Sequence, residues 1–157
     1  MIQRITPFLW FDNQAEDAAD FYVSIFKNSK IKGKTYYTGE EPVGEKGDLM
    51  TVVFELDGQE FTALNGRRRF DFTEAVSFVV NCESQEEIDY YWEKLTADGE
   101  EVQCGWLTDK FGVTWQVVPA RFEAWAKDPA GMARVMRALM PMKKLDLAEL
   151  ERAFAGD

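Results

Sequence analysis

The sequence contains no histidine among its 157 residues. Histidine is the side chain whose ordinary pKa lies near neutral pH, and it is the commonest metal ligand in proteins. Its absence excludes imidazole metal sites and every Ser-His or Cys-His nucleophile pair. Any catalysis would therefore have to use carboxylates, a thiol, tyrosine, lysine or backbone groups.

Cysteine and long apolar runs are also scarce. Only Cys82 and Cys104 are present, and their spacing matches neither a metal motif nor a redox motif. The first residues, MIQRITP, lack the apolar core of a signal peptide, and no apolar run reaches membrane-spanning length. We therefore expect two reduced thiols in a cytoplasmic protein that has no membrane partner.

Positive charge is the third shortage. The chain has 18 Lys and Arg against 28 Asp and Glu, a formal net charge of -10. Phosphate repels a surface of this sign, so binding to nucleic acid or anionic membranes is disfavoured. The 46% hydrophobic and 14% aromatic content is ample for a folded interior, and the length fits one compact domain or two small halves sharing a core.

The patterns that are present predict one order of elements twice. In the first copy a helix with apolar residues at three-to-four spacing follows an aromatic strand, with Asp12 or Asn13 as its cap. Asp57-Gly58 between two apolar runs indicates a hairpin. The strands of the first copy are expected at residues 6–11, 30–37, 50–56 and 59–65, and the helix at 15–26.

The second copy repeats this order. Ser84 and Glu87 have capping-box spacing at the start of the expected helix. Its strands are expected at 75–82, within 102–108 and at 113–119, and the helix at 85–95. The chain thus reads β-α-β-β-β in tandem, with one module at residues 1–66 and the next at 67–119.

Residues 120–157 are helical in pattern, and Asp128-Pro129 is typical of a helix start. Their apolar stripes fit either a helical cap that closes the core or a dimer contact. We expect this extension and the two modules to form one structural domain.

Particular residues make the chain resemble a known family. They are Thr6 to Phe11, Phe21-Tyr22, Glu55 to Phe61, Leu64 to Gly66, Ser77 to Cys82 and Cys104 to Gln116. With these residues the chain resembles the PhnB-like branch of the vicinal-oxygen-chelate superfamily, which includes glyoxalase I, extradiol dioxygenases and bleomycin-resistance proteins. This branch is often labelled a 3-demethylubiquinone methyltransferase domain. The resemblance implies an α+β fold with two tandem βαβββ modules that form a curled antiparallel sheet cup, plus C-terminal helices.

The resemblance also indicates where a metal would be held. Metal-dependent members place ligands on the first and fourth strand of each module, which here correspond to Thr6, Ala63, Ser77 and Gln116. Alanine cannot bind a metal, and neutral hydroxyl and amide oxygens are weak ligands for a transition metal. We therefore expect no metal site and no cofactor. A methyl-donor site is also disfavoured, because Asp12-Asn13-Gln14 after the first strand contains no glycine.

Alternation along the strands, in the register implied by the resemblance, predicts which side chains face the cup. The expected pocket residues are Thr6, Phe8, Trp10, Phe61, Ala63, Asn65, Ser77, Trp106 and Gln116, with Val79, Thr114 and Val118 on the same face. This mostly apolar and aromatic set fits a pocket for a small apolar or aromatic ligand. The alternative is that these side chains simply fill each half of the cup as core.

Two further features are candidates for chemistry. Cys104 is the candidate catalytic thiol, which would need a nearby cation such as Lys110; the alternative is a small buried apolar role. Arg67-Arg68-Arg69 either draw an anionic ligand toward the cup or form a solvated linker.

Two functions remain open from the sequence. The first is a metal-independent small-molecule binding protein, related to resistance proteins that sequester drugs. The second is an enzyme in which Cys104, Asn65 or Gln116 polarises a carbonyl or hydroxyl group, with a quinone-like or phenolic substrate as the family label suggests. The superfamily resemblance and the apolar stripes of the extension predict a homodimer.

Overall fold

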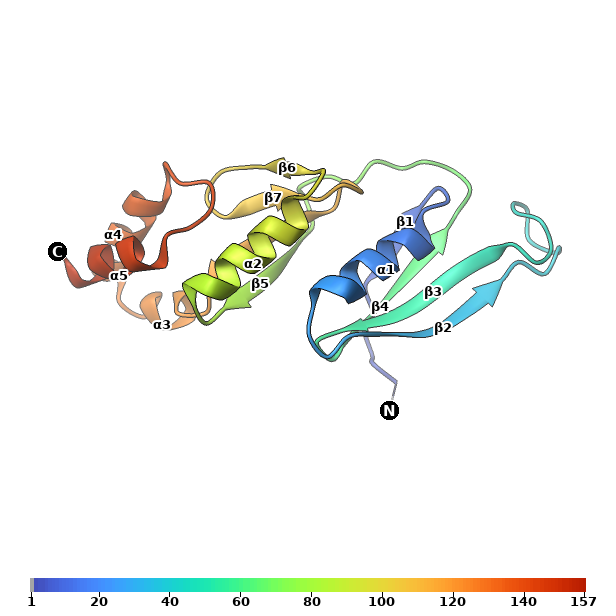
Figure 1. The fold of residues 1–157 in the computed structure, drawn as a ribbon, viewed down its shortest axis with the longest axis horizontal. Coiled ribbons are helices and arrows are strands. Elements are labelled where there is room, and N and C mark those ends of the chain that lie inside the picture. The colour runs from blue at the N-terminus through green and yellow to red at the C-terminus, as the bar shows by residue number, and fades with distance from the viewer. Residues whose placement is uncertain (1) are drawn as a thin grey trace. The chain divides into compact units, whose positions relative to one another are not determined.

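Each half of the chain builds one four-stranded sheet with a helix against it, in a computed structural model that describes residues 2–157 (Figure 1). The chain divides into two compact units, one ending at Asp71 and the other running from Phe72 to Asp157. The α+β class and the repeated β-α-β-β-β order are confirmed. No helix among the described residues is long and apolar enough to cross a membrane.

The first unit has the strand order β1-β4-β3-β2. Its elements are β1 (Phe8–Phe11), α1 (Ala15–Ile25), β2 (Lys30–Tyr36), β3 (Leu49–Leu56) and β4 (Gln59–Asn65). The expectation of an antiparallel sheet is wrong in one respect, because β1 and β4 pair in parallel and the sheet is mixed. Helix α1 returns the chain to its starting end, so β2 runs in the direction of β1, and two further reversals give β4 that direction again.

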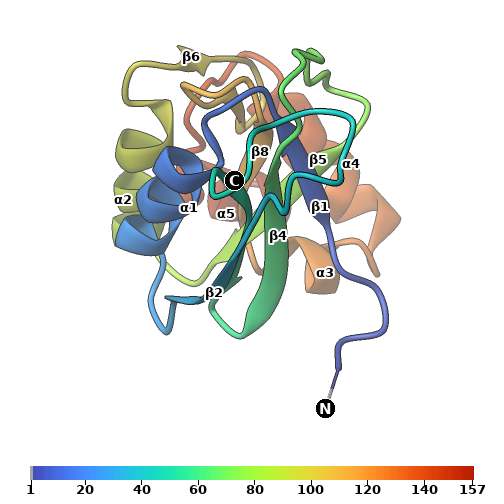
Figure 2. The same cartoon turned by 90° about the vertical axis from the view of Figure 1, so that its right-hand side faces the viewer.

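Helix α1 lies on one side only of the first sheet, as Figure 2 shows. The spacing of Ala15, Ala18, Ala19 and Tyr22 brings small residues and one ring onto the buried face of the helix. Small side chains let the helix approach the strands closely, and the Tyr22 ring stacks on Phe54 with centroids 6.2 Å apart.

The second unit has the equivalent order β5-β8-β7-β6. Its first elements are β5 (Ser77–Cys82), α2 (Gln85–Thr96), β6 (Glu100–Glu101), β7 (Trp106–Thr108) and β8 (Thr114–Pro119). The β5–β8 pair is again parallel, for the same topological reason. The predicted cap of α2 is confirmed, since the Glu87 backbone N–H donates to the Ser84 hydroxyl at 3.2 Å.

The C-terminal extension packs within the second unit. It contains α3 (Phe122–Trp125), α4 (Pro129–Leu139) and α5 (Leu147–Ala155). The Arg134 guanidinium donates to the carbonyl oxygens of Ala153 and Phe154 at 2.9 and 2.6 Å, which ties α4 to α5. Gln85 joins the extension to α2, because its amide oxygen accepts from the Leu147 N–H at 2.7 Å. The predicted helical pattern of residues 120–157 is therefore confirmed, while the choice between a cap and a dimer contact stays a prediction.

Candidate functional site

The pairing register decides which side chains share a face of the first sheet. Phe8 pairs with Thr62 and Trp10 with Leu64, and paired residues of neighbouring strands point to the same side. Phe8 is 57% exposed, whereas Leu9 and Phe11, which alternate with Phe8 and Trp10 along β1, are buried. Phe8 and Trp10 therefore lie on the face away from α1, together with Thr62 and Leu64.

Phe61, Ala63 and Asn65 lie on the opposite face. They alternate with Thr62 and Leu64 on β4, and all three are buried. The sequence predicted that these three residues share a face with Phe8 and Trp10. That prediction is wrong, because the register of β1 and β4 differs from the expected one by one residue. The physical reason is that β4 carries apolar residues on both faces, so alternation along this strand alone does not reveal which face meets the helix.

Asn65 has a structural role on that buried face. Its amide oxygen accepts from the backbone N–H of Ala15 at 2.8 Å, and its amide nitrogen donates to the Leu49 carbonyl oxygen at 3.3 Å. Ala15 is the first residue of α1, so Asn65 caps this helix from a neighbouring strand. The predicted cap, Asp12 or Asn13, is wrong: the N-cap position is Gln14, which makes no side-chain cap hydrogen bond.

Thr6 lies just before β1 and is half-buried. Its hydroxyl accepts from the Gln3 side-chain amide at 3.4 Å.

The second sheet brings the predicted polar residues together. Gln116 donates to the Ser77 hydroxyl at 2.9 Å, and Trp106 pairs with Gln116 across β7 and β8. Leu107, Trp115 and Val117 occupy the alternate, buried positions. Ser77, Trp106 and Gln116 thus share one face, as the sequence predicted, and their role as ligand-binding residues stays a prediction.

An open depression of about 470 Å³, called the cavity below, adjoins this face. It is lined by Phe72, Thr73, Glu74, Ala75, Thr108, Gly112 and Thr114. Thr108 and Ser77 both pair with Thr114, so the cavity opens on the face that carries Gln116 and Trp106. Its volume is within the range of small-molecule sites. Sequence reasoning missed Phe72 to Ala75, because a loop without periodic pattern gives no signal of what its side chains contact.

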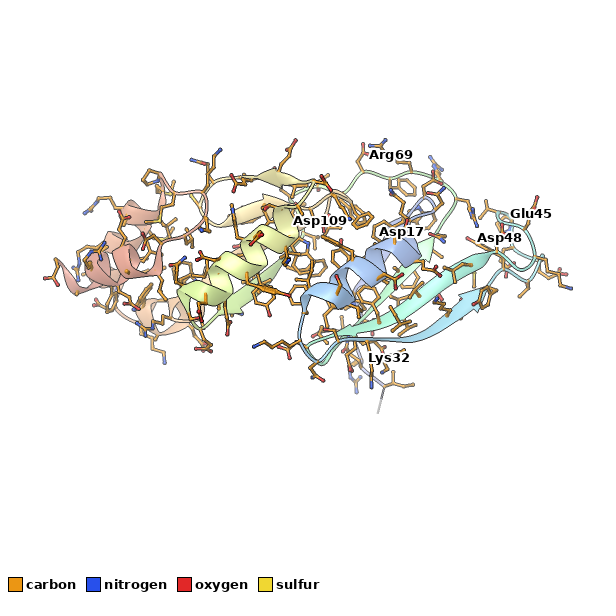
Figure 3. All side chains as sticks on the ribbon, in the orientation of Figure 1. Asp17, Lys32, Glu45, Asp48, Arg69 and Asp109 are labelled. Atoms are coloured by element: carbon orange, nitrogen blue, oxygen red, sulfur yellow. The ribbon has the colours of Figure 1, made fainter. Side chains whose placement is uncertain are left out.

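The turn between β7 and β8 is held by Asp109, which Figure 3 labels. One carboxylate oxygen accepts from the backbone N–H groups of Phe111 and Val113 at 2.8 and 3.0 Å. The other accepts from the Trp115 indole N–H at 2.8 Å. Since Gly112 and Thr114 line the cavity, this buried carboxylate positions one of its walls.

Cys104 lies in the turn between β6 and β7, with a left-handed backbone φ of 63°. Its sulfur is 3.6 Å from the Met140 carbonyl oxygen and 3.9 Å from the Met140 sulfur. Lys110, the cation expected nearby, lies over the Phe111 ring at 5.6 Å, and Cys104 does not line the cavity. A catalytic role for Cys104 stays a prediction.

The two thiols should differ strongly in reactivity. Burial, with a smaller contribution from Glu87 and Glu83, raises the pKa of Cys82 to about 12. Only the thiolate is nucleophilic, so Cys82 should stay unmodified at pH 8 while the half-exposed Cys104 reacts with iodoacetamide. Peptide mass spectrometry should find alkylation at Cys104 alone in the native protein and at both cysteines in denaturant. Equal labelling of both in the native protein would contradict this placement of Cys82.

The residues at the superfamily's metal positions do not fit a metal ion. Ala63 faces α1, while Ser77 and Gln116 are neutral and hydrogen-bonded to each other. Within residues 2–157 no three or more His, Cys, Asp or Glu side chains are grouped so that they could hold a metal. The donor set therefore offers no charged or imidazole ligand at these positions.

Comparisons with known proteins agree on a family. Residues 3–118 match the family described as 3-demethylubiquinone-9 3-methyltransferase. The structure of a PhnB protein from Bacillus cereus is 39% identical with a TM-score of 0.66, over 74% of this chain and 99% of that chain. None of the curated proteins compared with the chain matches it.

Two more distant structures share the fold. A Pseudomonas aeruginosa protein is 19% identical with a TM-score of 0.61, over 75% of this chain and 98% of that one. FosX from Listeria monocytogenes, a fosfomycin resistance protein solved with Mn(II) and sulfate, is 17% identical with a TM-score of 0.50. That match covers 80% of this chain and 99% of FosX.

Proposed function

The chain belongs to the family described as 3-demethylubiquinone-9 3-methyltransferase, and on that premise we propose that it binds a small organic molecule without a metal ion. The observation that carries the proposal is the cavity of about 470 Å³ in the second unit, whose lining residue Thr114 pairs with Ser77 in the sheet.

The lining of this cavity suits an uncharged ligand with hydroxyl or carbonyl groups. The hydroxyls of Thr73, Thr108 and Thr114 can each donate and accept, and the Glu74 carboxylate can accept from a ligand hydroxyl. The Phe72 ring adds an apolar surface for an aromatic ligand. A phenol or quinone would match this combination, and a carboxylate would be repelled by Glu74.

A thermal-shift screen of the metal-stripped protein tests the proposal. The screen includes neutral phenols and quinones, a methyl donor, and zinc, nickel and manganese ions. A ligand at one hundred times its dissociation constant stabilises the folded state by about 2.7 kcal/mol, a shift of several degrees. We expect such a shift with an organic compound and none with the metal ions. A reproducible shift with a metal ion would contradict the metal-independent proposal.

Isosteric variants locate the binding. Thr108→Val and Thr114→Val remove a hydroxyl from the cavity and should weaken binding about tenfold each. Thr62→Val makes the same change on the first sheet and should leave binding unchanged. If Thr62→Val alone weakens binding, the cavity is not the site. Mass spectrometry of the recovered ligand distinguishes the enzyme alternative, because an enzyme would return a product.

The proposal includes the homodimer expected from the superfamily. It is supported by two exposed methionines, Met136 in α4 and Met140 at the C-cap of that helix. Sedimentation equilibrium should give twice the chain mass of 18.1 kDa. A mass equal to one chain would contradict the homodimer but not the cavity.

A further inference from the structure

A short segment after β4 folds back over Trp10 in the first unit. The Gly66 and Arg67 N–H groups donate to the carbonyl oxygens of Phe11 and Asp12 at 2.7 and 2.9 Å. The Trp10 indole N–H donates to the Arg68 carbonyl oxygen at 2.7 Å. A Cβ on Gly66 would lie 2.1 Å from the indole ring, so the ring rests directly on the glycine backbone. Trp10 is therefore fixed in place.

One exposed ring contacts this fixed indole, and a second exposed ring lies on the same face of the sheet. The Phe70 ring meets Trp10 edge-on, with centroids 5.2 Å apart and an interplanar angle of 71°. Phe70 is 53% exposed, and Phe8 lies on the same sheet face, two residues before Trp10. Exposed aromatic surface held in a fixed arrangement is costly in water and is typical of a ligand-binding surface.

The three neighbouring arginines are not equivalent. Arg67 lies 3.3 Å from a carboxylate oxygen of Asp48, and Arg69 lies 3.0 Å from one of Asp71. The Arg68 guanidinium instead lies over the Phe70 ring, 5.0 Å from its centroid. Within residues 2–157, no carboxylate forms an ion pair with Arg68. Among the three arginines, the guanidinium group of Arg68 is therefore the one that remains open to an external anion.

From this arrangement we infer that the first unit carries a site for a planar aromatic anion, with the ring against Phe70 and Phe8 and the carboxylate on Arg68. The Arg68 guanidinium lies over the Phe70 ring, 5.0 Å from its centroid, so a ligand that contacts the exposed part of this ring also lies beside the cation. A neutral aromatic molecule leaves Arg68 unpaired, and a small anion leaves the rings exposed. This site extends the proposed function to a second ligand class. It uses residues of the first unit and the cavity uses residues of the second, so each proposal can fail without the other.

Calorimetric titration with 2-naphthoate tests the inference, with 2-naphthamide and acetate as matched probes. The carboxylate and the ring are both needed, so 2-naphthoate should bind at least tenfold more tightly than either probe. Arg68→Gln should weaken 2-naphthoate binding about tenfold or more. Phe70→Leu should weaken it several-fold by removing the ring.

Arg69→Gln is the matched control, because Arg69 is exposed, paired with Asp71 and projects from the same segment (Figure 3). It should change the affinity by less than twofold. No binding of 2-naphthoate to the unaltered protein, equal binding of 2-naphthamide, or an equal effect of Arg69→Gln would overturn the inference. Weakening by Thr114→Val would also overturn it, because the anion would then occupy the cavity of the second unit. Circular dichroism confirms that each variant is folded.

Discussion

Replacing Asp109 with alanine is expected to lower the free energy of unfolding by about 3 kcal/mol or more, because three donors lose their acceptor at once. The carboxylate is only 3% exposed, so water does not readily replace it. Each donor left unpaired in the interior costs about 1–3 kcal/mol, although the turn can relax and recover part of this. Urea unfolding followed by tryptophan fluorescence measures the change.

The Asp109 variants also test the cavity. Asp109→Asn keeps one carbonyl oxygen as an acceptor and should be destabilised less than Asp109→Ala. Asp71→Asn is the control, since that carboxylate is exposed and its ion pair with Arg69 is worth about 1 kcal/mol at most. Ligand affinity in the second unit should fall with Asp109→Ala, because Gly112 and Thr114 line the cavity. An Asp109→Ala protein as stable as the control would contradict the role assigned to this turn.

Replacing Asn65 with alanine is expected to cost about 2–3 kcal/mol of unfolding free energy. The change removes the cap of α1, worth about 0.5–2 kcal/mol, and leaves the Leu49 carbonyl oxygen and the Ala15 N–H without their partner. The same urea titration measures it. Ligand affinity in the second unit should be unchanged, because Asn65 is a structural residue of the first unit.

Asn81→Ala is the matched control for Asn65, because Asn81 is exposed on β5. A surface substitution of this kind should stay within about 0.5 kcal/mol. Asn65→Asp keeps the acceptor for the Ala15 N–H and should be intermediate in stability. The pocket role that the sequence predicted for Asn65 would regain support if Asn65→Ala abolished ligand binding while leaving stability unchanged.

These two residues illustrate the limits of sequence reasoning. The cap of α2 was predictable, because Ser84 and Glu87 are three residues apart and the bond is local. The cap of α1 was not, because Asn65 comes from a strand 50 residues away and no local pattern links it to Ala15. Asp109 likewise reads as an ordinary turn residue, and only the folded turn shows that Trp115 donates to it.

The candidate site shows the same division. The sequence could place Ser77 and Gln116 on one face, because side chains along the strands of the second module alternate between the two faces as predicted. Phe61 and Ala63 could not, because both faces of β4 carry apolar residues and a shift by one residue exchanges them. Similarly, the sequence shows three arginines in a row, whereas only the positions of Asp48, Asp71 and Phe70 distinguish Arg68 from its neighbours.

By itself the sequence determined the tandem β-α-β-β-β order, the helical extension, the family and the absence of imidazole chemistry. The family follows from the resemblance of particular residues, whereas the other three follow from local periodicity, capping and composition, which act over a few residues and can be read along the chain. Only the tertiary structure decided the parallel pairing of β1 with β4, the face that Asn65 occupies, and the loop that completes the cavity. Each of these depends on contacts between residues far apart in the chain, and such contacts arise only when strands pair and a helix covers one side of the sheet.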